Sequence, residues 1–204
     1  MNLTISIFPL LHLNAQVPAE EFGITPTCSE NEIQPFKEGE DKFIIYGNES
    51  LGYKIEYPKD WKVIQTHCLL EGMGVIYTSS IVNFVSTPNS DKNGLLGITV
   101  SDYSVGHSID EFAKVYTKDF GNMIESTKII MLDDKPSAKF TINAGNDSKL
   151  SQITILANDK RFDITHPISN IISNSTIQYM IDSFKIFHKD TINSDDLTEE
   201  DELG

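Results

Sequence analysis

The sequence has few of the residues that bind nucleic acid or an anionic membrane surface. It contains a single arginine, Arg161, and 16 basic against 30 acidic residues, for a formal net charge of −14. Phosphate groups are bound by a face rich in lysine and arginine, and anionic lipids attract the same residues. The composition therefore excludes both as expected partners.

Cysteine is nearly absent as well. Cys28 and Cys68 are the only two, and no CxxC pair is present that would indicate a zinc site or a thioredoxin-like motif. In an exported protein a disulfide between them would close a loop of about 41 residues and stabilise the fold by about 4 kcal/mol. Two unrelated thiols are the alternative.

No hydrophobic run is long enough to span a bilayer. The apolar residues 3–13, followed by Ala15, predict a signal peptide over residues 1–16, although no basic residue precedes them. A buried or disordered N-terminal segment is the alternative. A signal peptide predicts an extracytoplasmic or secreted protein. In such a protein the N-x-S/T sequons at Asn48, Asn146 and Asn174 would accept glycans. The alternative is that these three sequons occur by chance.

The negative charge is concentrated at the two ends of the chain. Residues 16–42 carry seven acidic against two basic residues, and residues 189–204 carry seven against one. With 39% hydrophobic residues, the nearly balanced centre can bury the core of one domain. We expect an acidic linker or N-terminal arm at 17–41, a folded domain at 42–188 and an acidic disordered tail at 189–204.

The strand and helix signals of the centre fall into blocks. A helix is predicted from Ser108, where Glu111 completes a capping box, and a second helix behind Asn174 or Ser175. Short strands are predicted at 43–46, 53–57, 74–77, 81–85, 95–100, 129–132, 138–144, 152–157 and 161–166. The Asn, Asp and Gly residues of AGNDSK and ANDKR predict tight turns between the last three strands. Strands, a helix, strands and a helix in this order predict an α+β fold, in which helices cover an antiparallel sheet.

One segment carries a family resemblance. FIIYGNESLGYKIEYPKDWKV begins at Phe43 and combines a short strand, a turn from Asn48 to Gly52, a second strand and a Tyr-Pro-x-x-Trp corner ending at Trp61. Together with the capped helix and the closing MIDSFKI, this order resembles the PsbP-like family over roughly residues 42–187. It is most similar to small single-domain members found in archaea, which are often exported.

The resemblance implies an α/β/α sandwich with a central antiparallel sheet. The best-known member of the family is an extrinsic subunit of photosystem II, which is not an enzyme. That partner does not carry over, because acidic residues occupy 17–41 where that subunit has a lysine-rich arm. The implied function is a non-catalytic, monomeric accessory or adaptor protein that needs no cofactor. It would bind a protein partner of unknown identity, or lie peripheral to a membrane complex.

Residues for catalysis or metal binding are few. No GxSxG elbow and no HExxH pair are present, so we predict no enzyme and no catalytic residue. Asp163 and His166 could supply a carboxylate and an imidazole to a metal and are weak candidates, with ordinary surface residues as the alternative. The competing hypothesis is therefore an extracytoplasmic protein that binds a small ligand or a divalent metal.

Overall fold

The computed structural model describes residues 25–33, 42–72, 75–86, 96–103, 106–145, 148–168 and 174–187, with the backbone alone at 25–33, 67–80 and 174. The strands are β1 (Thr25–Ile33), β2 (Phe43–Asn48), β3 (Tyr53–Pro58), β4 (Trp61–Gly72), β5 (Val75–Ser86), β6 (Leu96–Asp102), β7 (Ile124–Leu132), β8 (Lys135–Gly145), β9 (Ser148–Ala157), β10 (Lys160–Pro167) and β11 (Lys185–Ile186). The helices are α1 (Ile109–Phe120), followed by a 3-10 turn at Gly121–Met123, and α2 (Asn174–Ser183). The predicted signal peptide, the tail at 189–204 and Asn146 lie outside the described residues.

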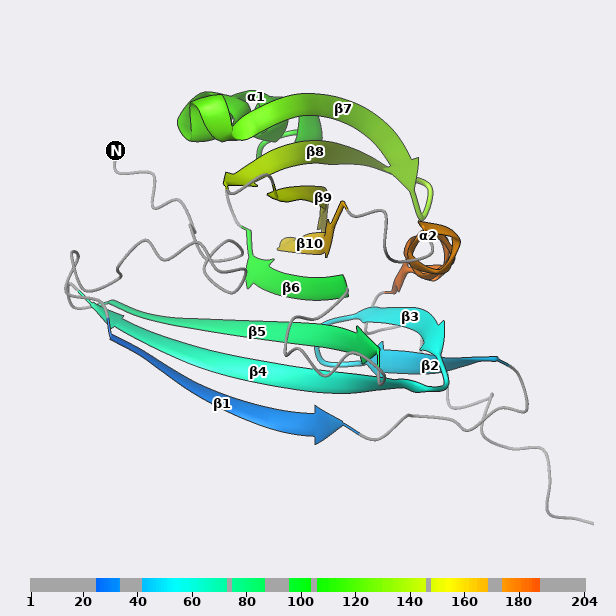
Figure 1. Cartoon of the computed structure of the whole chain (residues 1–204). Coiled ribbons are helices and arrows are strands. Elements are labelled where there is room, and N and C mark those ends of the chain that lie inside the picture. The colour runs from blue at the N-terminus through cyan, green and yellow to red at the C-terminus, as the bar shows by residue number, and fades with distance from the viewer. Residues whose placement is uncertain are drawn as a thin grey trace, which may run out of the picture.

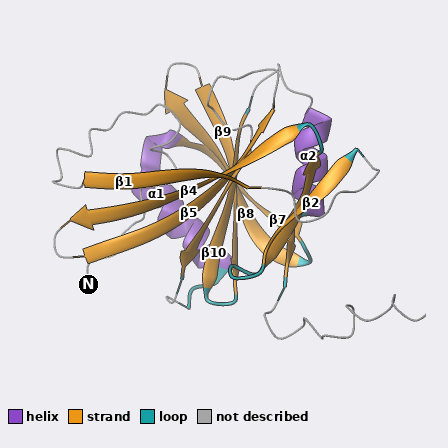
Figure 2. Ribbon diagram, turned by 90° about the horizontal axis from the view of Figure 1, so that it is seen from below, coloured by secondary structure: helices purple, strands orange, loops and turns teal. Residues whose placement is uncertain are grey.

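The strands form two antiparallel sheets. The larger has eight strands in the order β1-β4-β5-β6-β10-β9-β8-β7, and the smaller has three in the order β11-β3-β2. The large sheet is strongly curved from β7 round to β1 (Figure 1), and its strands fan out when seen from below (Figure 2). The predicted α+β class with an antiparallel sheet is confirmed. A second sheet was not expected.

Two tight hairpins hold the far side of the large sheet together. β7 and β8 are joined by Asp133 and Asp134, and β9 and β10 by Asn158 and Asp159, all four with positive φ. Two-residue loops of this conformation match the twist of antiparallel strands, and Asn and Asp tolerate it better than most residues. The tight turn that the sequence ANDKR predicts is therefore present.

The other side of the large sheet differs from the prediction. The strands predicted at 74–77 and 81–85 fall on one long strand, β5, which begins at Val75 and pairs along its full length with β4. β4 is not predicted by the sequence, because WKVIQTHCLLEG lacks a regular alternation of apolar and polar residues. β1 lies inside the segment expected to be an acidic linker or extended arm, and it pairs with β4 in turn.

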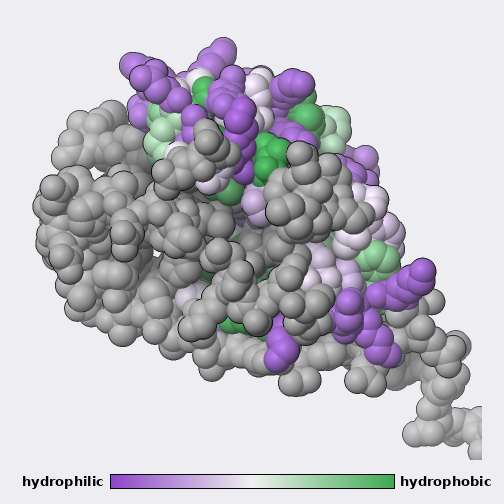
Figure 3. Space-filling model, in the orientation of Figure 1, coloured by the Kyte–Doolittle hydropathy of each residue, from purple (hydrophilic) through white to green (hydrophobic). Residues whose placement is uncertain are grey.

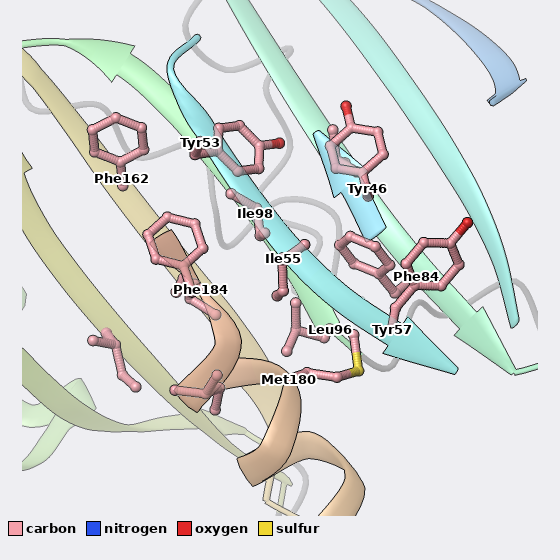
Figure 4. Packing of buried hydrophobic residues seen from close by; sticks show 14 of the residues in the cluster. Tyr46, Tyr53, Ile55, Tyr57, Phe84, Leu96, Ile98, Phe162, Met180 and Phe184 are labelled. Carbon is pink, nitrogen blue, oxygen red and sulfur yellow. The ribbon is translucent and has the colours of Figure 1, made fainter. Parts of the chain in front are cut away.

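The main core lies between the small sheet and one face of the large one. Tyr53 of β3, Phe162 of β10 and Phe184, just after α2, are fully buried, with ring centroids 5.6–6.2 Å apart. Figure 4 shows their rings with Met180 of α2 and Ile98 of β6 beneath β3. α2 thus shares this face with β2, β3 and β11. The α/β/α sandwich that the resemblance implies stays a prediction.

A second core lies on the opposite face, under α1. Ser108 and Glu111 form the predicted capping box, in which the Glu111 amide donates to the Ser108 hydroxyl and the Ser108 amide to the Glu111 carboxylate. These hydrogen bonds satisfy free amides of the first turn. Phe112 and Tyr116 then pack on Phe140 of β8, with centroid distances of 6.4 and 4.7 Å. α1 is thereby fixed over β8 and its neighbours.

The Tyr-Pro-x-x-Trp segment is a structural corner. β3 ends at Pro58, which has no amide for a ladder, and the Trp61 side chain is partly buried against the main core. Gly52 has φ of 76°, and a Cβ there would lie 2.9 Å from the carbonyl oxygen of Phe187. Its own carbonyl accepts a hydrogen bond from the Phe187 amide. Glycine is thus required where the residue after β11 meets the turn between β2 and β3.

Phe184→Ala tests whether the contact among α2, β3 and β10 holds the two sheets together. We expect a loss of about 3–5 kcal/mol in the free energy of unfolding, because a large ring would leave a cavity in a fully packed core. Val115→Ala is the control, since Val115 is exposed on α1 and should change stability by less than about 0.5 kcal/mol. Urea denaturation measures both. Equal losses would show that Phe184 does not connect the layers.

Candidate functional site

An ion pair lies buried on the α1 face of β10. Arg161 is 7% and Asp163 2% exposed, and the Arg161 Nη2 lies 2.6 Å from the Asp163 Oδ2. β10 runs between β6 and β9 in the middle of the sheet. Side chains two residues apart on a strand share a face, which brings the chain's one arginine and this carboxylate together.

Polar side chains of β9 and α1 surround the carboxylate. The Asp163 Oδ1 accepts hydrogen bonds from the Thr154 hydroxyl (2.6 Å) and the Gln152 Nε2 (3.2 Å). The Gln152 Oε1 in turn accepts one from the Tyr116 hydroxyl at 3.2 Å. All of these groups are buried. A continuous set of hydrogen bonds therefore runs from α1 to β10.

Aromatic rings cover the guanidinium. The Arg161 Cζ lies 5.1 Å from the centroid of Phe112 and 5.6 Å from that of Tyr116. Both distances permit a cation–π attraction, which is stronger where water is excluded. Nε and Nη2 of Arg161 have no acceptor with hydrogen-bond geometry among the described residues; Nη2 is close to Asp163 but poorly aligned with it. The charge of Arg161 is thus balanced mainly by one carboxylate and two rings.

The surroundings shift two pKa values. Burial opposes the charged form of Arg161, but the adjacent Asp163 raises the pKa of the guanidinium overall. Burial, followed by the negative charge of Asp163, raises the pKa of Tyr116 to about 12. Arg161 is therefore a permanent cation and Tyr116 a neutral hydrogen-bond donor at neutral pH. Neither acts as a base, and the Thr154 hydroxyl and the Asp163 carboxylate are bonded to each other inside the fold. The geometry is that of a structural polar core beneath α1.

The two weak metal candidates are not brought together. Asp163 faces α1, whereas His166, three residues further along the same strand, lies on the opposite face. The Asp163 carboxylate is occupied by Arg161, Thr154 and Gln152, and the His166 Nδ1 lies 3.1 Å from the carbonyl oxygen of Pro167. In the described part of the chain, no three His, Cys, Asp or Glu residues gather as metal ligands would.

Sequence reasoning missed the partners of Asp163. The segment RFDITHP predicts a strand with one face exposed to solvent, because Arg161 and Asp163 alternate with Phe162 and Ile164. The missing information was that Phe112 and Tyr116 of α1 need a face to cover. Of the sequons, Asn48 is the last residue of β2, and its Oδ1 accepts hydrogen bonds from the Ser50 hydroxyl and the Leu51 amide of the following turn. Asn174 begins α2.

Comparison with solved structures gives distant likenesses. The chain is similar to the solution structure of cyanobacterial PsbP (CyanoP) from Synechocystis sp. PCC 6803, with 12% identity, a TM-score of 0.48, and coverage of 73% of this chain and 95% of that one. It is also similar to a crystal structure from Bacteroides thetaiotaomicron VPI-5482, with 11% identity, a TM-score of 0.43, and coverage of 71% and 48%. Neither score establishes a shared fold or function, and neither organism is an archaeon.

Comparison with family models and curated proteins gives no match. Among the described residues, no helix is both long and apolar enough to cross a membrane.

Asp163→Asn tests the ion pair. It keeps the shape but removes the charge that balances Arg161, so we expect a loss of about 3–5 kcal/mol in the free energy of unfolding. Asp102→Asn is the matched control: Asp102 pairs with Lys160 at 3.0 Å but is exposed, and its loss should cost less than about 1 kcal/mol. Chemical denaturation measures the free energy of unfolding of both variants. Similar losses in the two variants would mean that the buried charge of Arg161 does not need Asp163 to balance it.

His166 gives a pH test. Burial, with a smaller contribution from the positive charge of Lys139, lowers its pKa below the ordinary value. The unfolded chain then binds a proton more readily than the folded one, so stability present above about pH 6.5 is lost as the pH falls through the folded pKa. His166→Gln should reduce this slope, measured by urea denaturation across the range. An NMR titration placing the imidazole pKa at or above its ordinary value would contradict the assignment.

Proposed function

We propose that the chain is a non-catalytic accessory protein of the PsbP-like type that binds a protein partner along the outer edge of β7. The sequence motifs from Phe43 to Trp61 support the family. The buried polar residues of the sheet support a role without catalysis, because they hold α1 in place. The observation that carries the proposal is the surface of β7 itself.

β7 is the last strand of the large sheet, and within the described residues only β8 pairs with it. Ile129 is 45% and Met131 63% exposed, two residues apart on the same face of this strand. α1 covers that face near Thr127, whose hydroxyl lies 2.9 Å from that of Thr117, and leaves the two apolar side chains uncovered. Figure 3 shows hydrophobic atoms at the surface over β7 among hydrophilic ones.

The opposite face of β7 carries a lysine next to Ile130 and Leu132, which pack against the main core. Lys128 lies directly across from Lys139 of β8, and no acidic residue forms an ion pair with either lysine in the part of the chain that is described. Like charges at directly opposite positions destabilise a sheet. An acidic group from a partner would remove this repulsion. We therefore propose an extended partner segment with apolar residues that cover Ile129 and Met131 and a carboxylate that reaches Lys128.

Such a segment would add a strand to the sheet. An unpaired edge offers amides and carbonyls in register, and the alternating side chains of the added strand provide specificity. The bulge at Ile124 and Ser126 distorts one end of β7 only. The rest of the strand can accept a partner.

The proposal places the protein outside the cytoplasm. The apolar run at residues 3–13 and Ala15 support this location. A partner at the surface of a membrane complex would fit the same location.

A photo-crosslinking amino acid at position 131 tests this proposal in native cells. We expect one neighbouring protein to be recovered reproducibly from position 131 and not from position 115, where Val115 is also exposed but lies on α1. Lys128→Glu should reduce that crosslink at least about tenfold, since a repulsive pair would replace an attractive one. Recovery of the uncrosslinked chain alone, or equal yields with Lys128→Glu, would count decisively against the β7 edge.

A further inference from the structure

The two cysteines of the chain meet across a strand pair. β1 and β4 are antiparallel, and their register places Cys28 directly opposite Cys68, near the middle of a ladder that runs from Thr25 opposite Glu71 to Ile33 opposite Val63. The sequence contains no other cysteine. The sheet therefore brings together two positions with 39 residues between them in the sequence.

This backbone position suits a covalent bond. Directly opposite residues of an antiparallel pair have Cα atoms about 4.5 or about 5.5 Å apart, depending on their hydrogen bonding. Both separations lie within the range of about 4.4–6.8 Å that disulfides adopt. Opposite residues also lie on the same face of the sheet. Either class of pair therefore permits the bond without movement of the backbone.

We propose that Cys28 and Cys68 form a disulfide that fastens the edge strand β1 to β4. The oxidant is a low-molecular-weight disulfide such as oxidised glutathione. One cysteine thiolate attacks it and releases one glutathione thiolate; the second cysteine thiolate then attacks the mixed disulfide and releases the other. Two protein thiols become one disulfide, and one glutathione disulfide becomes two thiols. Electrons and protons balance.

The bond would control the edge of the large sheet. Only β4 pairs with β1 among the described strands, so the loss of β1 would expose residues 63–71 of β4 as a new edge. Edge strands open more readily than central ones, and an open edge can pair with another chain. The proposed disulfide keeps this edge closed, and reduction allows β1 to detach.

The full-length protein, refolded in a glutathione redox buffer, tests the bond. We expect an intact mass lower than that of the reduced chain by two hydrogen atoms, no alkylation by iodoacetamide under native conditions, and a peptide that links residues 28 and 68 after digestion. A matched variant combines Cys28→Ser with Thr27→Cys, which moves the thiol one position along β1, onto the other face and opposite Leu69. This variant should remain alkylatable. Free thiols in the native chain, or a disulfide that forms equally well in the moved variant, would overturn the proposal.

Hydrogen exchange tests the consequence separately. After reduction, or in Cys28→Ser, the amides of β1 and of the β4 edge should exchange at least about tenfold faster, while those of β9 and β10 remain unchanged. Unchanged exchange in β1 would show that the bond does not fasten the strand. Faster exchange throughout the sheet would show a general loss of stability and contradict the assigned local role.

Discussion

The structure depends on the burial of both faces of β10. Its residues alternate between Phe162 and Ile164, which enter the main core, and Arg161 and Asp163, which lie under α1. A single charge in that position would have to lose its hydration without compensation, at a cost of several kcal/mol. The paired charges, the hydrogen bonds from β9 and the two aromatic rings together make the polar face compatible with burial. α1 can then cover this face without leaving a charge unbalanced.

The same constraint separates the two cores. The side chains packed around Phe162 are apolar or aromatic and accept α2 and the small sheet, whereas the face with Asp163 accepts a helix that can offer both rings and a hydroxyl group. The small and the large sheet are connected at Asp133, in the turn between β7 and β8. Its carboxylate accepts from the Ile186 amide and forms ion pairs with Lys135 and Lys185. The small sheet is thus attached to a hairpin of the large one.

How far the sequence predicts the fold depends on where each residue finds its partners. The capping box at Ser108 and the turn at Asn158 and Asp159 are local, because their hydrogen bonds and dihedral angles involve neighbouring residues, and both were predicted. β4 was missed because its conformation is set by pairing with β5 rather than by its own alternation. The polar cluster was missed for the same reason: only the approach of Tyr116 shows that the face with Asp163 is covered.

The two ends of the large sheet present opposite solutions to the same problem. An edge strand exposes amides and carbonyls that another chain can use. At β7 the edge is unpaired among the described strands; it carries Ile129 and Met131 on one face and, on the other, Lys128 opposite Lys139 of β8, the features on which the proposed acidic, apolar partner rests. At the other end β1 covers β4. Cys28 of β1 lies opposite Cys68 of β4. Because the central polar groups are used within the fold, the proposed binding would depend on these edges, and the oxidation state of the two cysteines would determine whether β1 or β4 forms the second edge.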